Sequence, residues 1–170
     1  MELATNRASK VRFLILFFLL VAGLSLLIKL PAVDQWIITP YVEGITSIAG
    51  FISGIASGSV EASRTYLHHP DFSVNIKKGC DGIIATIILV SACIAFPSTW
   101  KMKVLGILSG YLLIFILNIA RILLLFSLGV HGEMELFNLV HVYVAQFIVI
   151  VGAMVFWIYW AGKTRTVSAG

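Results

Sequence analysis

The sequence predicts an all-α integral membrane protein with four transmembrane helices and a further helical segment on the outer face. The chain of 170 residues is 59% hydrophobic and only 12% charged, about half the charged fraction of a typical soluble domain. Arg121 is the single charge between Val104 and His131, and no charge lies between His141 and Lys163. Apolar runs of about 20 residues cross the bilayer as helices, because a helix satisfies its own backbone hydrogen bonds.

Four apolar runs are the predicted spans, at about residues 11–30, 82–97, 104–129 and 139–161. The first run follows a basic start, but it is too long for a signal peptide and lacks a clear cleavage site, so we expect a retained anchor helix. Pro97 closes the second run. The chain is too short for a second domain, and residues 1–170 are expected to form one membrane domain.

The distribution of charge predicts the orientation. With four spans, seven of the 12 Lys and Arg residues lie in inner segments, and seven of the eight Asp and Glu residues lie outside. Cytoplasmic segments carry the excess of Lys and Arg, so both termini are expected in the cytoplasm. If the glycine- and serine-rich run at 41–59 also crossed, this bias would weaken. We therefore expect the segment 31–79 on the outer face, with 41–59 as a helix lying on or dipping into the membrane surface and a short extended piece within 65–78.

Two general features exclude other classes of protein. The net charge of +4 is explained by the membrane topology, so no nucleic-acid partner is expected. Cys80 and Cys93 are predicted roughly 20 Å apart along one helix, too far for a disulfide. Cys93 lies deep in its span and is expected to be a small apolar packing residue.

Cys80 occupies a different environment, at the outer mouth of the second span. Gly79 precedes it and Asp81 and Gly82 follow, so access is open and backbone amides can approach a substrate. A helix start and the two lysines just before Gly79 both favour the thiolate. Cys80 is therefore a candidate nucleophile, with apolar packing as the alternative.

Arg121 lies inside the third span, roughly 12 Å below its outer end. A charge within the membrane is by default functional or paired. Asn118 lies one turn earlier on the same face, where it could hold the guanidinium. The alternative is a structural ion pair with Asp81 or Glu135 that orients the helices.

His141 lies in the first turn of the fourth span, and topology places it in the same outer layer as Cys80 and Arg121. A cysteine beside a histidine is the pattern for nucleophilic acyl transfer, and a fixed cation can stabilise a thiolate or an oxyanion. His141 could instead be an interfacial histidine that bonds a carbonyl. Metal ligation is weakly supported by the spacing, so neither a metal nor another cofactor is expected, and the remaining histidines are expected in solvated loops: His68, His69 and His131.

Three short blocks resemble those of the exosortase/archaeosortase family. They are "GCDGI" at 79–83, "NIARI" at 118–122, and the histidine of "FNLVHVYV" at 137–144. Their order, spacing and placement on successive helices agree with the family over about Gly79 to Trp160. The short chain and the "FPSTWKMK" turn are most similar to the subgroup called exosortase H.

The resemblance implies a sortase-like cysteine transpeptidase or protease in the bacterial cytoplasmic membrane, with its active site on the periplasmic face. Its substrates would be membrane-anchored proteins whose C-terminal sorting signal has a proline-containing motif, a hydrophobic helix and a basic tail. Cleavage would pass them to an acceptor that the sequence does not identify. By position, Cys80 would be the nucleophile, Arg121 its catalytic partner and His141 the general acid/base. The supporting or substrate-binding residues would be Asn118, Gly79, Asp81 and Gly82.

A non-enzymatic class competes with this interpretation: a helical membrane subunit in which Arg121 makes a structural ion pair. It predicts that Cys80→Ser leaves function intact and that Arg121→Lys is mild, whereas the enzyme predicts that both are severe. In a third interpretation the histidines hold a metal or haem, which the visible absorbance of the purified protein would reveal.

Overall fold

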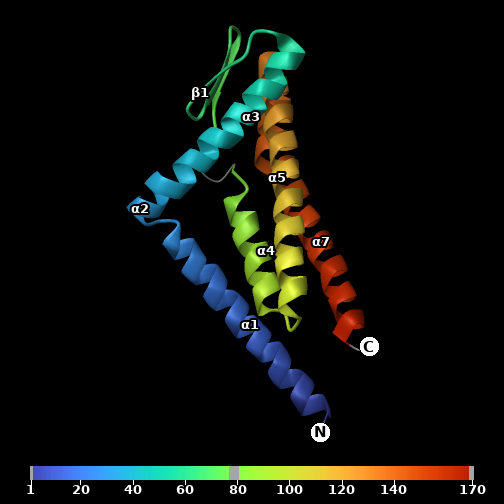
Figure 1. Cartoon of the computed structure of the whole chain (residues 1–170). Helices are drawn as coiled ribbons and strands as arrows, with labels where there is room; N and C mark the ends of the chain where they lie inside the picture. Colours follow the sequence, from blue (N-terminus) through green and yellow to red (C-terminus); the bar gives the residue numbers. More distant parts are fainter. Residues whose placement is uncertain (1, 77–80, 169–170) are drawn as a thin grey trace.

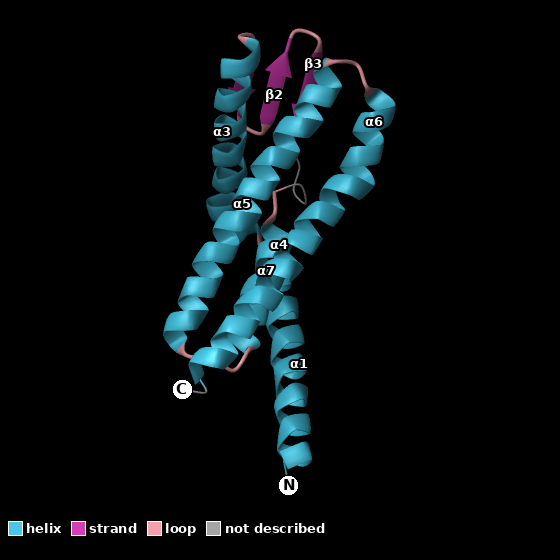
Figure 2. Cartoon of the chain, turned by 90° about the vertical axis from the view of Figure 1, so that its right-hand side faces the viewer, coloured by secondary structure: helices cyan, strands magenta, loops and turns pink. Residues whose placement is uncertain are grey.

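The structure is a computed structural model that describes residues 2–76 and 81–168. Helices dominate it, and a small sheet lies at the end opposite to both chain termini (Figures 1 and 2). In chain order the elements are α1 (Glu2–Leu27), α2 (Pro31–Val33), the π-helix η1 (Asp34–Ile38), α3 (Thr39–Ser57), β1 (Glu61–Ser63), β2 (Tyr66–His69), β3 (Phe72–Asn75), α4 (Ile83–Ala95), α5 (Trp100–Val130), α6 (Met134–Leu139), the π-helix η2 (Val140–Val144) and α7 (Ala145–Ser168).

Three of the predicted spans are confirmed as helices that are long and apolar enough to cross a membrane. Among the described residues these stretches are Ser9–Leu27, Trp100–Val130 and Met134–Thr164. The remaining predicted span, at residues 82–97, is α4, with 13 residues. It covers about 20 Å, less than the roughly 30 Å of a hydrocarbon core. Four membrane crossings therefore remain a prediction.

The expectation of an all-α chain is wrong, because residues 61–75 form a three-stranded antiparallel sheet in the order β1-β2-β3. Ser63 pairs with Tyr66, and His69 pairs with Phe72, so two-residue turns join the strands. Arg64, in the first turn, has a positive φ of 54°, the backbone conformation found in the turn types that two-residue hairpins favour. The extended piece expected within 65–78 is confirmed as β2 and β3.

The helix expected at 41–59 is α3, which leads obliquely from the end of α1 to the sheet (Figure 1). It packs on the sheet and on the C-terminal part of α5. Leu67, on the alternating strand β2, points into the core they share and is fully buried. The buried members of this shared core are Ile38, Val42, Ile45, Ala49, Leu67, Ile76, Ile119, Ile122 and Phe126.

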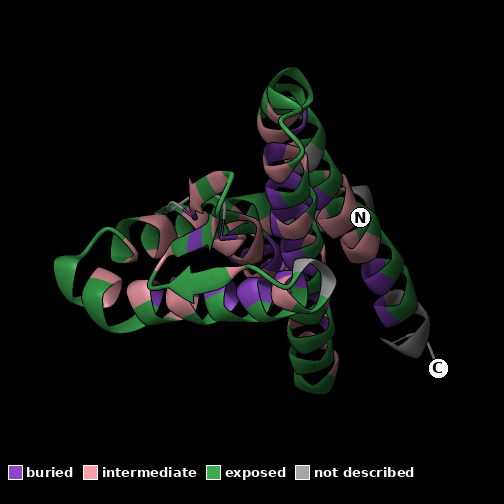
Figure 3. Ribbon diagram, turned by 90° about the horizontal axis from the view of Figure 1, so that it is seen from above, coloured by how far each residue is buried: buried purple, intermediate pink, exposed green. Residues whose placement is uncertain are grey.

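A second core joins α4, α5 and α7 at the other end of the molecule. Close approaches fix the antiparallel register of α5 and α7, with Gly106 against Trp160 and Gly152 against Leu117. Cys93 is fully buried there, as predicted for a packing residue. Figure 3, viewed from the sheet end, shows buried positions on the inward faces of the helices and exposed ones outside. The buried residues are Leu89, Cys93, Phe96, Ile114, Val149, Trp160 and Ala161.

Candidate active site

One layer of the molecule joins the start of α4, the middle of α5 and the beginning of α7. Gly82 lies against α5, where a Cβ at position 82 would be 3.5 Å from the Cβ of Asn118. Arg121, one turn further along α5, donates a hydrogen bond to Gln146. The antiparallel packing of three helices therefore brings residues 81–82, 118–121 and 141–146 to one level.

The depth of this layer follows from the length of α5. That helix begins at Trp100, and 21 residues (121 − 100) at 1.5 Å each place Arg121 about 32 Å along it. A hydrocarbon core is about 30 Å thick. The layer is thus about one hydrocarbon thickness from the start of α5 at Trp100. The sheet lies beyond it (Figure 2), and Ile119 and Ile122 of the core shared with α3 lie level with it.

Arg121 is held between two acceptors from one helical segment. Its side chain is buried, and the residue is only 8% exposed. Nη1 donates to Oε1 of Gln146 at 3.0 Å, and Nη2 donates to the backbone carbonyl of His141 at 3.4 Å. Because a guanidinium is a planar fork that carries its charge at any physiological pH, two acceptors fix both its position and its plane.

The π-helix η2 explains why one segment supplies both acceptors. His141 lies inside η2, and Gln146 follows five residues later. A π-helix bonds residue i to i+5, so it brings residues five apart to the same side of the helix. Gln146 was missed by the sequence analysis. The sequence does contain one indication that Gln146 is unusual. It is the one side-chain amide in the charge-free run that follows His141.

The ring of His141 stacks on Phe137, with ring centroids 5.7 Å apart and an interplanar angle of 11°. Nδ1 is buried and has no hydrogen-bond partner within the described part of the chain. The backbone carbonyl of His141, not its ring, accepts the bond from Arg121. The imidazole is therefore oriented by stacking and retains an unused ring nitrogen at the level of the guanidinium.

Asp81 and Gly82 shape the start of α4. Asp81 is only 3% exposed, and its Oδ1 accepts the backbone N–H of Ile83 at 3.0 Å, which satisfies one of the N–H groups left free at the start of the helix. The Tyr41 hydroxyl donates to the Asp81 carbonyl at 3.4 Å. Burial raises the pKa of Tyr41 well above its usual range, so this phenol stays a donor. Gly82 has a φ of +76°, a left-handed conformation that disfavours any residue with a Cβ.

Asn118 is 1% exposed, and neither Nδ2 nor Oδ1 has a hydrogen-bond partner among the described residues. The expectation that it holds the Arg121 guanidinium is wrong, because Gln146 and the His141 carbonyl do so. A buried amide without partners costs about 1–3 kcal/mol. Such a group is typical of a site where a bound ligand or water supplies the missing hydrogen bonds.

Cys80 and Gly79 lie outside the described residues, so their predicted roles stay predictions. Asp81, the next residue after Cys80 in the sequence, lies in the layer with Gly82. The other histidines are remote from this layer: His68 and His69 belong to β2, and His131 follows the C-terminal end of α5. Within residues 2–76 and 81–168, no group of three or more His, Cys, Asp or Glu side chains could hold a metal ion.

A buried arginine, a buried amide and a histidine lie in one layer between apolar helices. This arrangement is that of a helical membrane protein with a polar site inside its helix bundle. The chain belongs to the transmembrane exosortase family, whose model, described as transmembrane exosortase (Exosortase_EpsH), matches residues 5–159. This confirms the family resemblance, and membership implies exosortase-type transpeptidase processing of C-terminal sorting signals. Comparisons with curated proteins and with solved structures give no match.

Proposed function

We propose that this protein is a cysteine transpeptidase that cleaves C-terminal sorting signals of membrane-anchored proteins at the outer membrane surface. The cleaved protein is then transferred to an acceptor. The observation that supports this most directly is the pair of hydrogen bonds that Arg121 donates to Gln146 and to the His141 carbonyl. It provides a fixed cation at the level of Asp81, the residue next to Cys80 in the sequence.

In the first half-reaction, Cys80 acts as the nucleophile. Its thiol proton passes to the His141 imidazole, and the sulfur attacks the carbonyl carbon of the scissile peptide bond. A carbon–sulfur bond forms, and the carbonyl electron pair moves to the oxygen. When this oxyanion collapses, the carbon–nitrogen bond breaks and His141 returns the proton to the leaving amine. The product that stays on the enzyme is a thioester.

In the second half-reaction, the acceptor attacks the thioester carbonyl. Its proton passes to His141, the carbon–sulfur bond breaks, and the sulfur of Cys80 recovers a proton from His141. Energy from the original peptide bond is conserved in the thioester, so the transfer needs no external energy source. If water is the acceptor, the same steps give hydrolysis.

The remaining residues of the layer have supporting roles. Arg121 stabilises negative charge on the Cys80 sulfur or on the oxyanion, because a preorganised cation is most effective where water is excluded. Asp81 and Gly82 set the path of the chain that carries Cys80, through the hydrogen bond at the start of α4 and the left-handed turn. Asn118 offers a donor and an acceptor to the peptide backbone of the substrate.

The membrane arrangement follows from the same layer. α1, α4, α5 and α7 are proposed to cross the membrane, with both termini in the cytoplasm and the layer near the outer surface. Both ends of the chain lie at one end of the molecule (Figure 2), as an even number of crossings requires. A scissile bond just outside a substrate's own membrane helix would lie at this level.

Processing of a tagged reporter in cells tests the proposal. The reporter carries a motif, an apolar helix and a basic tail, and signals with different proline-containing motifs form a panel. The wild-type chain is expected to yield a shortened product, and Cys80→Ala is expected to reduce the rate about a thousandfold or more, as for loss of a nucleophile elsewhere.

Cys93→Ala is the matched control, because Cys93 is fully buried in the inner core. It is expected to retain processing at equal protein level. Equal processing by wild type and Cys80→Ala would remove Cys80 as nucleophile and favour the structural interpretation of Arg121.

A further inference from the structure

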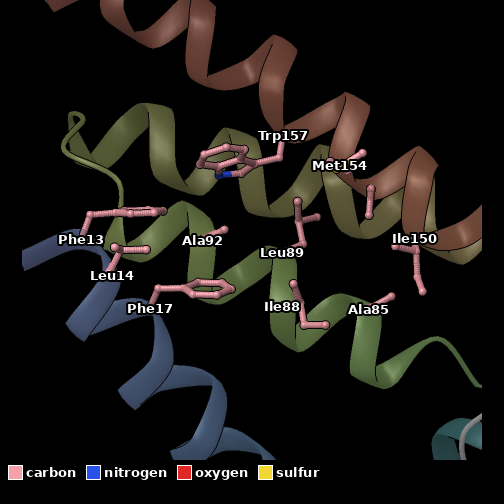
Figure 4. A pocket seen from close by; sticks show the side chains of 11 residues that line it. Phe13, Leu14, Phe17, Ala85, Ile88, Leu89, Ala92, Ile150, Met154 and Trp157 are labelled. Atoms are coloured by element: carbon pink, nitrogen blue, oxygen red, sulfur yellow. The ribbon is translucent and has the colours of Figure 1, made fainter. Parts of the chain in front are cut away.

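An apolar groove of about 350 Å³ lies between α1, α4 and α7. Its walls are side chains of these three helices, which point toward one shared space (Figure 4). Among the residues that the structure describes, no polar or charged side chain apart from the indole of Trp157 lines it. The lining residues are Phe13, Leu14, Phe17, Ala85, Ile88, Leu89, Ala92, Ile150, Ala153, Met154 and Trp157.

The groove begins directly below the polar layer. Ala85 lies three residues after Gly82 on α4, and Ile150 lies four residues after Gln146, on the same face of α7. From there the groove follows α4 for about 10 Å, to Ala92. Its direction is inward, away from the sheet, because α4 descends from the layer toward the inner ends of α5 and α7.

The size and lining of the groove limit what can occupy it. A helix about 10 Å wide and 30 Å long has a volume on the order of 2,000 Å³, so 350 Å³ cannot enclose one. It can take the large side chains of one helix face. Ala85, Ala92 and Ala153 form parts of the wall where a neighbouring backbone can approach closely, as small residues allow between membrane helices.

We propose that this groove receives one face of the apolar helix of the sorting signal, which enters sideways from the bilayer. The inference rests on the proposed function. A scissile bond in the polar layer requires the helix that follows it to run inward from that layer. The groove starts at the layer and runs in that direction, so one substrate can occupy both. The alternative occupant is a lipid chain, which is not covalently connected to a group bound in the polar layer.

Photo-crosslinking tests this placement. The reporter is first chosen from the panel because the wild-type chain processes it. Benzoylphenylalanine then replaces Met154 in the Cys80→Ala background, where the reporter stays intact. The matched control replaces Val155, the next residue on α7. Both positions are similarly exposed, at 52% and 58%, but only Met154 lines the groove.

A reporter crosslink at least about fivefold stronger from position 154 than from position 155 is expected. Equal or absent reporter crosslinks at both positions would overturn the inference while leaving the proposed function intact. So would an adduct at position 154 with the mass of a lipid, or of a second copy of the chain. If no reporter in the panel is processed, the proposed function fails and the inference fails with it.

A second variant fills the groove without a crosslinker. Ala153→Leu places a larger side chain in the wall and is expected to lower reporter processing about tenfold, in the range that overpacking produces. Val155→Phe adds comparable bulk at an exposed position outside the groove and is expected to process normally. Both variants are compared at equal amounts of folded, membrane-integrated protein. Normal processing by Ala153→Leu would contradict the proposed placement.

Discussion

Arg121 and Gln146 lie 25 positions apart in the sequence and are joined by a hydrogen bond of 3.0 Å from Nη1 to Oε1. The amide of Gln146 is neutral, so this contact orients the guanidinium without cancelling its charge. The His141 carbonyl supplies the second acceptor. Together they turn a flexible side chain into a cation of defined position, which is what stabilisation of a developing anion requires.

Gln146 is therefore predicted to be a positioning residue. Gln146→Met keeps the length of the side chain but removes the acceptor, and a hydrogen bond to a charged group contributes about 1.5–3 kcal/mol. We expect kcat for reporter processing to fall about tenfold or more, with KM little changed. Phe147→Leu, at an exposed position beside it, is the control. A higher KM with unchanged kcat would mean that Gln146 binds substrate instead.

Arg121→Lys tests whether a positive charge alone is enough. Lysine offers a point charge without a planar fork, so it cannot hold the same two acceptors in the same plane. We expect processing to fall about a hundredfold, similar to the loss of one oxyanion-stabilising donor in other enzymes.

The thermal stability of the solubilised Arg121→Lys protein separates this loss from misfolding. A melting temperature near that of the wild type, together with severe loss of processing, supports the enzyme. Near-normal processing would support the competing view of Arg121 as a structural ion-pair residue.

Gly82→Ala is predicted to disturb the site more than the fold. A left-handed alanine costs about 1–2 kcal/mol, and its Cβ would lie 3.3 Å from Cγ2 of Ile114 and 3.5 Å from Asn118. We expect processing to fall at least about tenfold, because small displacements of reacting groups are costly.

Gly132→Ala is a close control for this variant. Gly132 has a φ of +77°, almost the same as the +76° of Gly82, but a Cβ there meets nothing within 4 Å. The two variants should lose similar amounts of stability in thermal unfolding, and only Gly82→Ala should lose activity. Equal activity in both would show that the contact of Gly82 with α5 is not needed for processing.

Asn118→Leu is predicted to raise stability and lower activity. Leucine keeps the shape of Cβ, Cγ and two δ atoms but removes the buried amide that lacks partners within the described residues. Removing such a group should stabilise the fold by about 1–3 kcal/mol, measured as a higher melting temperature. Processing should fall at least about tenfold if the amide binds the substrate backbone. A stabilised variant with full activity would exclude Asn118 from the site.

The apolar runs were predictable because membrane helices are specified locally, by length and by the scarcity of charge. The helices at 11–30, 104–129 and 139–161 were confirmed on these grounds. The sheet was only suggested as a short extended piece, because its three strands are short and gain their stability from packing on α3 and α5. The all-α prediction failed for that reason.

The chemically exceptional residues are evident from composition and charge alone. Arg121 and Asn118 stand out in an apolar run because burying a charge or an amide is expensive. Their contacts depend on how the helices pack against one another. Gln146 reaches Arg121 because η2 changes the register of the last long helix and Gly152 lets that helix approach Leu117. The groove likewise depends on how α1 lies against α4 and α7. Such contacts join distant segments, so their geometry is a property of helix packing, which no local pattern encodes.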